Sequence, residues 1–196
     1  MTKNEQFEKL YLAGTVNPIL AADCPVKFPL HWHQYVEIMA LPHDAAVNIS
    51  PVITINNLKY TLQPGDIAFA WSGELHEIDS NTEKQVIALQ FPGNLISELG
   101  EFMPLLNSFR SIHIISAREH PDLSRQLHAH LSHMTALKLS EEAFHNVEIL
   151  ICLYELFIAF GNHVRNHRAA PAFDPSSCQS LSKMTRACSY ISENCE

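Results

Sequence analysis

One short stretch of the sequence gathers side chains that bind transition metals. His31, His33 and Glu37 lie in the run His-Trp-His-Gln-Tyr-Val-Glu, and a further histidine, His76, follows in a later segment. If the first run is an extended strand, residues 31, 33, 35 and 37 share one face, because successive side chains of a strand point to opposite sides. A strand that carries His76 opposite this face would complete the cluster. Three imidazoles and one carboxylate suit a divalent transition metal such as Zn, Ni, Fe or Mn, with positions left open for water or substrate.

Aromatic residues flank this cluster in the sequence. Tyr35 shares the predicted face with the histidines, so we expect it to line a ligand site, whereas Trp32 is expected to pack on the other face. Trp71 is a further candidate for ligand binding, because a flat aromatic ring can stack on a sugar or an aromatic molecule. Its face on the strand is not fixed by the pattern. Core packing is the simpler explanation for most of these rings.

Short alternating runs bounded by turn residues predict the strands that position the cluster. The predicted strands are Tyr35–Leu41, Ala45–Ile49, Val52–Ile55, Leu58–Leu62, Ile67–Trp71 and Gln85–Phe91, with a short final strand at Ile112–Ile115. Asn56 and Asn57 predict a two-residue hairpin turn, because asparagine tolerates a positive φ. Gln63–Asp66 predicts a tight turn with Gly65 in the left-handed region. This spacing of strands and turns favours a barrel or a sandwich.

Helical periodicity begins at Pro121. Leu123, Leu127, Leu131 and Met134 form one apolar stripe of a first helix. A second helix is predicted over about Glu141 to His167, with Ser140 as its N-cap. It is apolar nearly all round between residues 147 and 160, so it needs cover on more than one side. Packing on the barrel and the first helix, and contact with a second copy in a dimer, are equally favoured and compatible explanations.

Three further histidines lie in the first predicted helix. His130 and His133 are i, i+3 neighbours that could share a metal, but the stripe formed with His128 avoids Leu127 and Leu131. A solvated helix face is therefore the favoured interpretation of these histidines. The chain offers no credible Ser/His/Asp or Cys/His arrangement by spacing and no phosphate-binding glycine motif.

The order of these motifs resembles a known family. The pattern H-x-H-x3-E, followed by a Gly-Asp segment and Gly73-x-x-His76, is similar to the two metal-binding motifs of cupins, with His31, His33, Glu37 and His76 at the ligand positions. Trp71 departs from this pattern, because cupins often have proline there. The stretches HWHQYVEIM and VITINNLKYTLQPGDIAFAWSGELHEI, followed by two helices, resemble the sensor domains of AraC-type transcriptional regulators.

The resemblance implies a mainly β protein with α-helices: a cupin barrel, which is a double-stranded β-helix or jelly roll, followed by a helical dimerisation region. Its predicted parts are an effector-binding barrel at 1–115, dimerisation helices at 116–168, a linker at 169–180, and the start of a truncated helix-turn-helix domain at 181–196. The tail LSKMTRACSYISENC resembles the first helix of such a DNA-binding domain. DNA would be bound only through the missing C-terminal domain.

The predicted function is therefore to sense a small, sugar-like metabolite in the barrel and to dimerise, without catalysis. The ligand-binding candidates are His31, His33, Tyr35, Glu37, Trp71 and His76. The four ligand-type residues hold a metal, line a polar effector pocket or form a hydrogen-bonded cluster inside the barrel. A metal-dependent cupin enzyme, an oxygenase or isomerase, is the main alternative, and a pure dimerisation module with a degenerate barrel is the third.

Composition excludes some classes of function. The 196 residues carry 13 Lys and Arg against 21 Asp and Glu, a net charge of -8, which would repel a phosphate backbone. The polar start of the chain does not resemble a secretory signal, and five scattered cysteines fit reduced thiols better than a disulfide framework. No apolar run reaches the ~20 residues of a membrane span. We expect a cytoplasmic homodimer without membrane contact.

Overall fold

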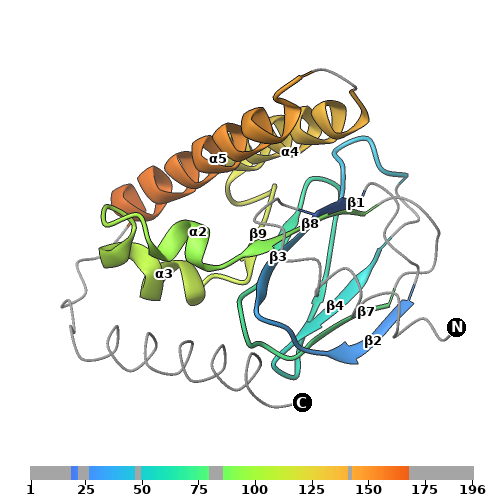
Figure 1. The fold of residues 1–196 in the computed structure, drawn as a ribbon. Coiled ribbons are helices and arrows are strands. Elements are labelled where there is room, and N and C mark those ends of the chain that lie inside the picture. The colour runs from blue at the N-terminus through green and yellow to red at the C-terminus, as the bar shows by residue number, and fades with distance from the viewer. Residues whose placement is uncertain (1–18, 22–26, 47–49, 80–85, 141–142, 168–196) are drawn as a thin grey trace, which may run out of the picture.

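The computed structural model describes residues 19–21, 27–46, 50–79, 86–140 and 143–167, in which nine strands form two antiparallel sheets (Figure 1). The five-stranded sheet has the order β1 (Ile19–Ala21), β8 (Ile87–Pro92), β3 (Tyr35–Ala40), β6 (Ile67–Ala70) and β9 (Ile114–Ile115). The four-stranded sheet has the order β2 (Lys27–His31), β7 (His76–Asp79), β4 (Val52–Ile55) and β5 (Leu58–Thr61). The chain passes repeatedly from one sheet to the other, which is the pattern of a double-stranded β-helix.

The turns between strands follow the turn residues. Asn56 and Asn57 have φ angles of 48° and 66° and join β4 to β5 as a two-residue hairpin, as predicted. Gly65 has φ of 89° in the turn before β6, which confirms the prediction for that position. A Cβ atom at Gly65 would lie 2.5 Å from Nδ1 of His43, so any other residue would also clash there.

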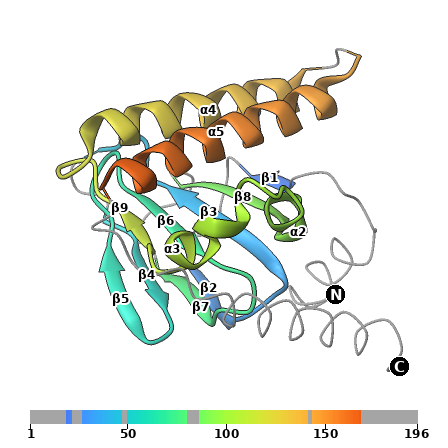
Figure 2. The ribbon, with the colours of Figure 1, turned by 90° about the vertical axis from the view of Figure 1, so that its left-hand side faces the viewer.

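Helices follow the barrel. Three short elements, α2 (Asn94–Ser97), η1 (Met103–Leu105) and α3 (Leu106–Arg110), precede β9. The long helices α4 (Pro121–Leu139) and α5 (His145–His167) then pack side by side over the five-stranded sheet (Figures 1 and 2). The predicted stripe of α4, Leu123, Leu127, Leu131 and Met134, is fully buried.

Two predicted boundaries were wrong. Ser140 has an extended backbone and ends α4 rather than capping α5, which begins only at His145. Residues 143–144 form a turn in which Phe144 has φ of 70°, so the second helix does not include them. Of the predicted strand Ala45–Ile49, residue 45 is a bend, residue 46 has no regular structure, and the rest lies outside the described residues. The prediction also missed β1 and β2, and it expected a strand at His76 without giving the bounds of β7.

The two faces of the five-stranded sheet contribute to different cores. Inside the barrel, aliphatic side chains of both sheets, such as Met39, Ile53 and Ile78, pack together. Between this sheet and the helices lies an aromatic core. It contains Phe69, Trp71, Phe91, Phe102, Phe109, Phe157 and Phe160. The predicted fold class, mainly β with a barrel followed by helices, is confirmed.

Helix α5 is long and apolar enough to cross a membrane by length and composition alone. Half of its most apolar window is buried inside the protein, however, and Leu153, Phe157 and Phe160 lie in the core against the sheet. A core helix passes the same test, and these contacts account for the apolar side of α5 that faces the barrel.

Candidate metal centre

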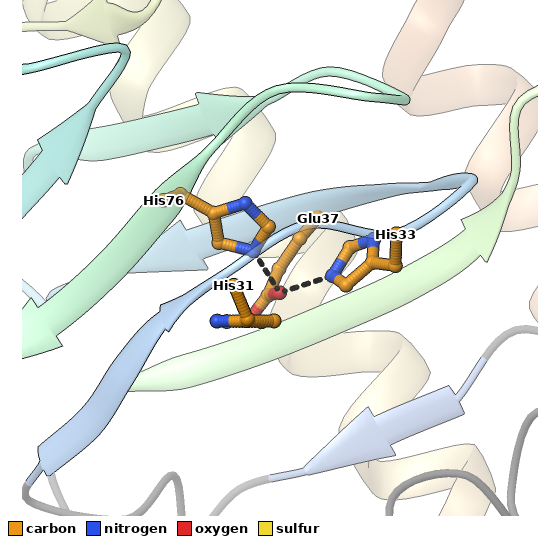
Figure 3. Close-up of side chains that lie close together, drawn as sticks. All are labelled: His31, His33, Glu37 and His76. Atoms are coloured by element: carbon orange, nitrogen blue, oxygen red, sulfur yellow. Dashed lines mark hydrogen bonds and ion pairs between the residues drawn. The ribbon is translucent and has the colours of Figure 1, made fainter.

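The four predicted ligand residues meet inside the barrel. The ligand atoms of His31, His33, Glu37 and His76 all lie within 4.8 Å of one another (Figure 3). His33, Glu37 and His76 are buried, and His31 is half-buried. The predicted cluster is therefore present as a spatial group, and His31 is its most accessible member.

The route by which the chain builds the cluster differs from the prediction. Residues 31, 33, 35 and 37 do not lie on one strand: His31 ends β2 in the four-stranded sheet, and Tyr35 begins β3 in the five-stranded sheet. His33 lies in the connection between the two sheets. His76, at the start of β7, pairs with His31 across the four-stranded sheet. The ligands converge because the barrel closes around them. Alternation of side chains along one strand does not predict this arrangement.

The Glu37 carboxylate is the centre of the cluster. Its Oε2 lies 3.1 Å from Nε2 of His33 and 3.2 Å from Nε2 of His76. The side-chain amide of Gln90 donates a third hydrogen bond of 2.9 Å to the same oxygen. Burial alone would raise the pKa of Glu37, but the hydrogen bonds from both histidines hold this pKa well below its ordinary value. The carboxylate is therefore charged at neutral pH.

Each imidazole is oriented by a backbone carbonyl. Nδ1 of His31 donates to the Pro29 carbonyl at 2.8 Å, Nδ1 of His33 to Tyr35 at 3.1 Å, and Nδ1 of His76 to Glu74 at 2.8 Å. A carbonyl can only accept, so Nδ1 carries the proton in all three rings. Nε2 can therefore bind a metal through its lone pair when the ring is neutral, and it can donate to Glu37 when the ring is protonated. Hydrogen bonds of this kind fix the tautomer and direction of metal-ligating histidines in proteins.

The protonation of the histidines depends on their place in the cluster. Burial and the neighbouring His76 lower the pKa of His31 to about 4, so His31 is neutral at pH 7. Burial alone would lower the pKa of His76 as well, but its hydrogen bond to Glu37 raises this pKa above the ordinary value. Without a metal, a proton on His76 partly balances the buried carboxylate. A divalent cation at the same place would balance it more completely.

The turn before β7 places His76. Gly73, with φ of 84°, donates its N–H to the backbone carbonyl of His33 and so ties the two ligand-bearing connections together. Glu74 accepts hydrogen bonds from the backbone N–H of Trp71 and from the side chain of Asn56. Its carboxylate also lies 3.0 Å from Nε2 of His113. Glu74 thus supports the cluster from outside, and its carbonyl is the group that orients His76.

The aromatic candidates have different places. Tyr35 lies beside the cluster, with its ring centroid 6.3 Å from that of His33. Trp71 does not: its indole stacks between Phe69 and Phe109 in the core under the helices, and its Nε1 donates to the Ile112 carbonyl. The prediction that Trp71 lines the ligand site is therefore wrong in location. Core packing explains this residue.

Two other predictions need correction. Trp32, expected to pack, is 60% exposed, because residue 32 lies in the connection between the sheets rather than in a strand. His128, expected on a solvated face, is buried and donates to the Gly65 carbonyl. His133 is exposed as predicted, whereas His130 is half-buried beside Cys152.

Gln90 belongs to the site, and sequence reasoning missed it. It pairs directly with Glu37 in the register of β3 and β8, so both side chains point into the barrel. A signal was present: Gln90 is the only polar residue in the run Ile-Ala-Leu-Gln-Phe. A lone polar side chain in a buried strand needs a hydrogen-bond partner inside the protein.

The donor set fits a metal ion. Three imidazole nitrogens and one carboxylate are the ligand types preferred by Zn, Fe, Ni and Mn. Ligands about 2.1 Å from one metal are separated by about 3 to 3.4 Å at octahedral or tetrahedral angles. The observed Nε2 to Oε2 distances of 3.1 and 3.2 Å match that range. When bound, the metal would supply a Lewis acid inside the barrel.

No protein-family model and no curated protein sequence matches this chain. Among solved structures, it is similar to a predicted oxalate decarboxylase from Thermotoga maritima, with 20% identity and a TM-score of 0.30, over 47% of this chain and 75% of that chain. A Bacillus subtilis oxalate decarboxylase is 22% identical with a TM-score of 0.30, over 40% of this chain and 22% of that one. The cupin domain of Schizosaccharomyces pombe Cnp3 is 11% identical with a TM-score of 0.30, over 41% of this chain and 58% of that one.

The last two matches cover less than two thirds of the other chain. Likenesses this distant do not carry an activity over to this protein. The order of strands in the two facing sheets, with the His/Glu group between them, assigns the cupin fold.

Proposed function

We propose that the barrel holds one divalent transition metal through His31, His33, Glu37 and His76, and that a small-molecule effector binds there. The observation that carries this proposal is that ligand atoms of all four residues lie within 4.8 Å of one another inside the barrel, while a backbone carbonyl orients Nδ1 of each ring. Four protein ligands leave two positions of an octahedral ion open. A sugar-like metabolite with adjacent hydroxyl groups suits these positions.

We infer that effector binding is transmitted through the five-stranded sheet. Glu37 lies on the inner face of β3, and the neighbouring Val36 and Ile38 belong to the core under the helices. A shift of β3 at the site therefore changes the surface on which α5 rests. Coupling of ~1 to 3 kcal/mol between the two arrangements is enough for regulation. This supports the role implied by the AraC-type resemblance: a cytoplasmic sensor that reaches DNA through a further C-terminal domain.

The outer face of α5 supports the proposal that the sensor is a homodimer. Val147, Ile151 and Ile158 are 53%, 54% and 52% exposed and lie on one side of the helix. A second copy of this chain is the occupant we propose, because two such stripes bury each other across a two-fold axis. Sedimentation of wild type should show a dimer that Ile151→Glu dissociates. A monomer at every concentration tested would contradict this proposal.

A metal-dependent oxygenase or isomerase is the second candidate function. The observation in its favour is that all four ligand positions are occupied by ligand-type residues and three of them are buried, as in a site that protects a reactive centre. The two functions differ in what happens to a bound small molecule. A sensor returns it unchanged, whereas an enzyme converts it at many equivalents per metal.

The deciding experiment is the metal content of tag-free, chelator-washed protein, measured by elemental mass spectrometry. Wild type is expected to retain about one metal per chain more than a variant that lacks a barrel ligand. His33→Ala should lose it, whereas His133→Ala, which removes an exposed histidine on α4, should keep it. Absence of metal in all three proteins would contradict the metal site and leave an organic-effector sensor or a plain dimerisation module.

A further inference from the structure

A second group of ligand-type side chains lies between the two long helices, away from the barrel. It consists of His130 on α4 and of Cys152 and Glu155 on α5, whose ligand atoms lie within 4.8 Å of one another. Cys152 is buried, the His130 side chain is 20% exposed, and the Glu155 side chain is 58% exposed. The group therefore has a buried sulfur at its base and an edge that is open to solvent.

The nitrogen-to-sulfur distance in this group matches that around a tetrahedral ion. Nδ1 of His130 lies 3.5 Å from Sγ of Cys152 and 3.7 Å from Oε2 of Glu155. A Zn–N bond of about 2.0 Å and a Zn–S bond of about 2.3 Å at a tetrahedral angle place the nitrogen and the sulfur about 3.5 Å apart. The nitrogen and the sulfur thus lie at the spacing that a shared metal requires, and the exposed Glu155 carboxylate lies slightly beyond the about 3.3 Å expected for a nitrogen and an oxygen on one ion.

Without a metal, the thiol of Cys152 is unreactive. Burial, with a contribution from Glu155, raises the pKa of its thiol to about 11, so the sulfur is protonated and not a nucleophile at neutral pH. The thiol then lies 3.4 Å from the backbone carbonyl of His130, to which it can donate. A thiophilic cation would displace the thiol proton and gain a strong ligand, which neither Glu155 nor His130 alone provides.

We propose that His130, Cys152 and Glu155 form a second, Zn²⁺-type metal site that joins α4 to α5, with a fourth position open to water. It lies on the helices that cover the outer face of the five-stranded sheet. The ion would cross-link the two helices and stabilise their packing by mass action. Because it uses none of the barrel ligands, this site is independent of the function proposed for the barrel.

Cobalt(II) tests the site, because a thiolate bound to Co²⁺ gives a charge-transfer absorption that histidine and carboxylate ligands do not give. The experiment uses the full chain, reduced and stripped of metal, with His33→Ala present to disable the barrel site. We expect the band to appear on titration with Co²⁺, to saturate near one equivalent and to disappear on addition of Zn²⁺. In the same background, Cys152→Ser should lack the band.

The other four cysteines lie outside the described residues, so the Cys152→Ser protein also measures their contribution. Glu155→Gln provides a variant that leaves the helix core untouched, and we expect it to weaken Co²⁺ binding at least tenfold. Glu148→Gln, an exposed change on the same helix, should leave binding unchanged. The proposal is overturned if no band forms in the His33→Ala protein, if the band persists in Cys152→Ser, or if the two glutamate variants behave alike.

Discussion

On the inner face of the five-stranded sheet, Glu37 and Gln90 meet two histidines in a charged, hydrogen-bonded group. On the outer face of the same sheet, Phe69 and Phe91 are buried against Phe160 and Phe157, with ring centroids 5.0 and 5.6 Å apart. Gln90 and Phe91 are adjacent in β8 and belong to opposite faces. One face can therefore carry the chemistry while the other carries the stability, because neighbouring side chains of a strand point to opposite sides.

Phe157→Ala should have the largest effect on stability and no direct effect on the site. This ring is fully buried and lies beside five others, those of Trp71, Phe91, Phe102, Phe109 and Phe160. We expect the free energy of unfolding to fall by about 3 to 5 kcal/mol, as for other buried aromatic residues replaced by alanine. Urea denaturation measures this loss. If the folded variant also bound metal tenfold more weakly, the separation of the two faces would be refuted.

Glu37→Gln should act mainly on metal affinity, in contrast to Phe157→Ala. It removes the only carboxylate among the four barrel ligands while keeping a side chain of the same shape. We expect metal affinity to fall by more than the ~10- to 100-fold that the loss of an outer hydrogen-bond partner costs. Competition with a chromophoric chelator measures the affinity. An unchanged affinity would show that the histidines alone hold the ion.

Adjacent positions 90 and 91 offer a matched pair. Gln90→Leu removes the amide that donates to Glu37, and we expect it to weaken metal binding by ~10- to 100-fold. Phe91→Leu changes the next residue on the outer face, and we expect it to lower stability while metal affinity stays as in wild type. The same chelator competition and urea titrations apply to both. Equal effects of the two changes on metal affinity would contradict the division of roles between the inner and outer faces of the sheet.

The smallest expected effect concerns the junction between the two layers. His128 on α4 donates to the Gly65 carbonyl in the barrel, and burial together with the nearby His43 lowers the pKa of His128 to about 4. Between the unfolded value of about 6.5 and this folded value, the unfolded chain binds a proton that the folded protein does not. Stability contributed here is present above about pH 6.5 and falls as the pH drops towards about 4.

His128→Gln keeps a donor for Gly65 but does not titrate, so we expect a shallower loss of stability on acidification. The urea midpoint measured at neutral and at acidic pH compares the two proteins. The pKa of His31 is also lowered, so both proteins should still lose some stability as the pH falls. His133→Gln on the exposed side of α4 is the control and should follow wild type. Identical slopes for His128→Gln and wild type would show that His128 is not the titrating group.

The residue types of the site and the main elements were accessible from the sequence. The spacing of His31, His33, Glu37 and His76 identified all four members of the barrel cluster, and the asparagine and glycine turns were predicted at their observed positions. The buried stripe of α4 followed from helical periodicity. These features depend on local geometry, which a short stretch of chain encodes by itself.

Only the tertiary structure decided which side chains meet. Closure of the barrel brings β2 and β3, which belong to different sheets, around one carboxylate, and it adds Gln90 from a strand more than fifty residues away. The packing of helices on the sheet placed Trp71 in the core and brought His130 to Cys152. Contacts between distant segments depend on how whole layers pack, and no local pattern in the sequence records that arrangement.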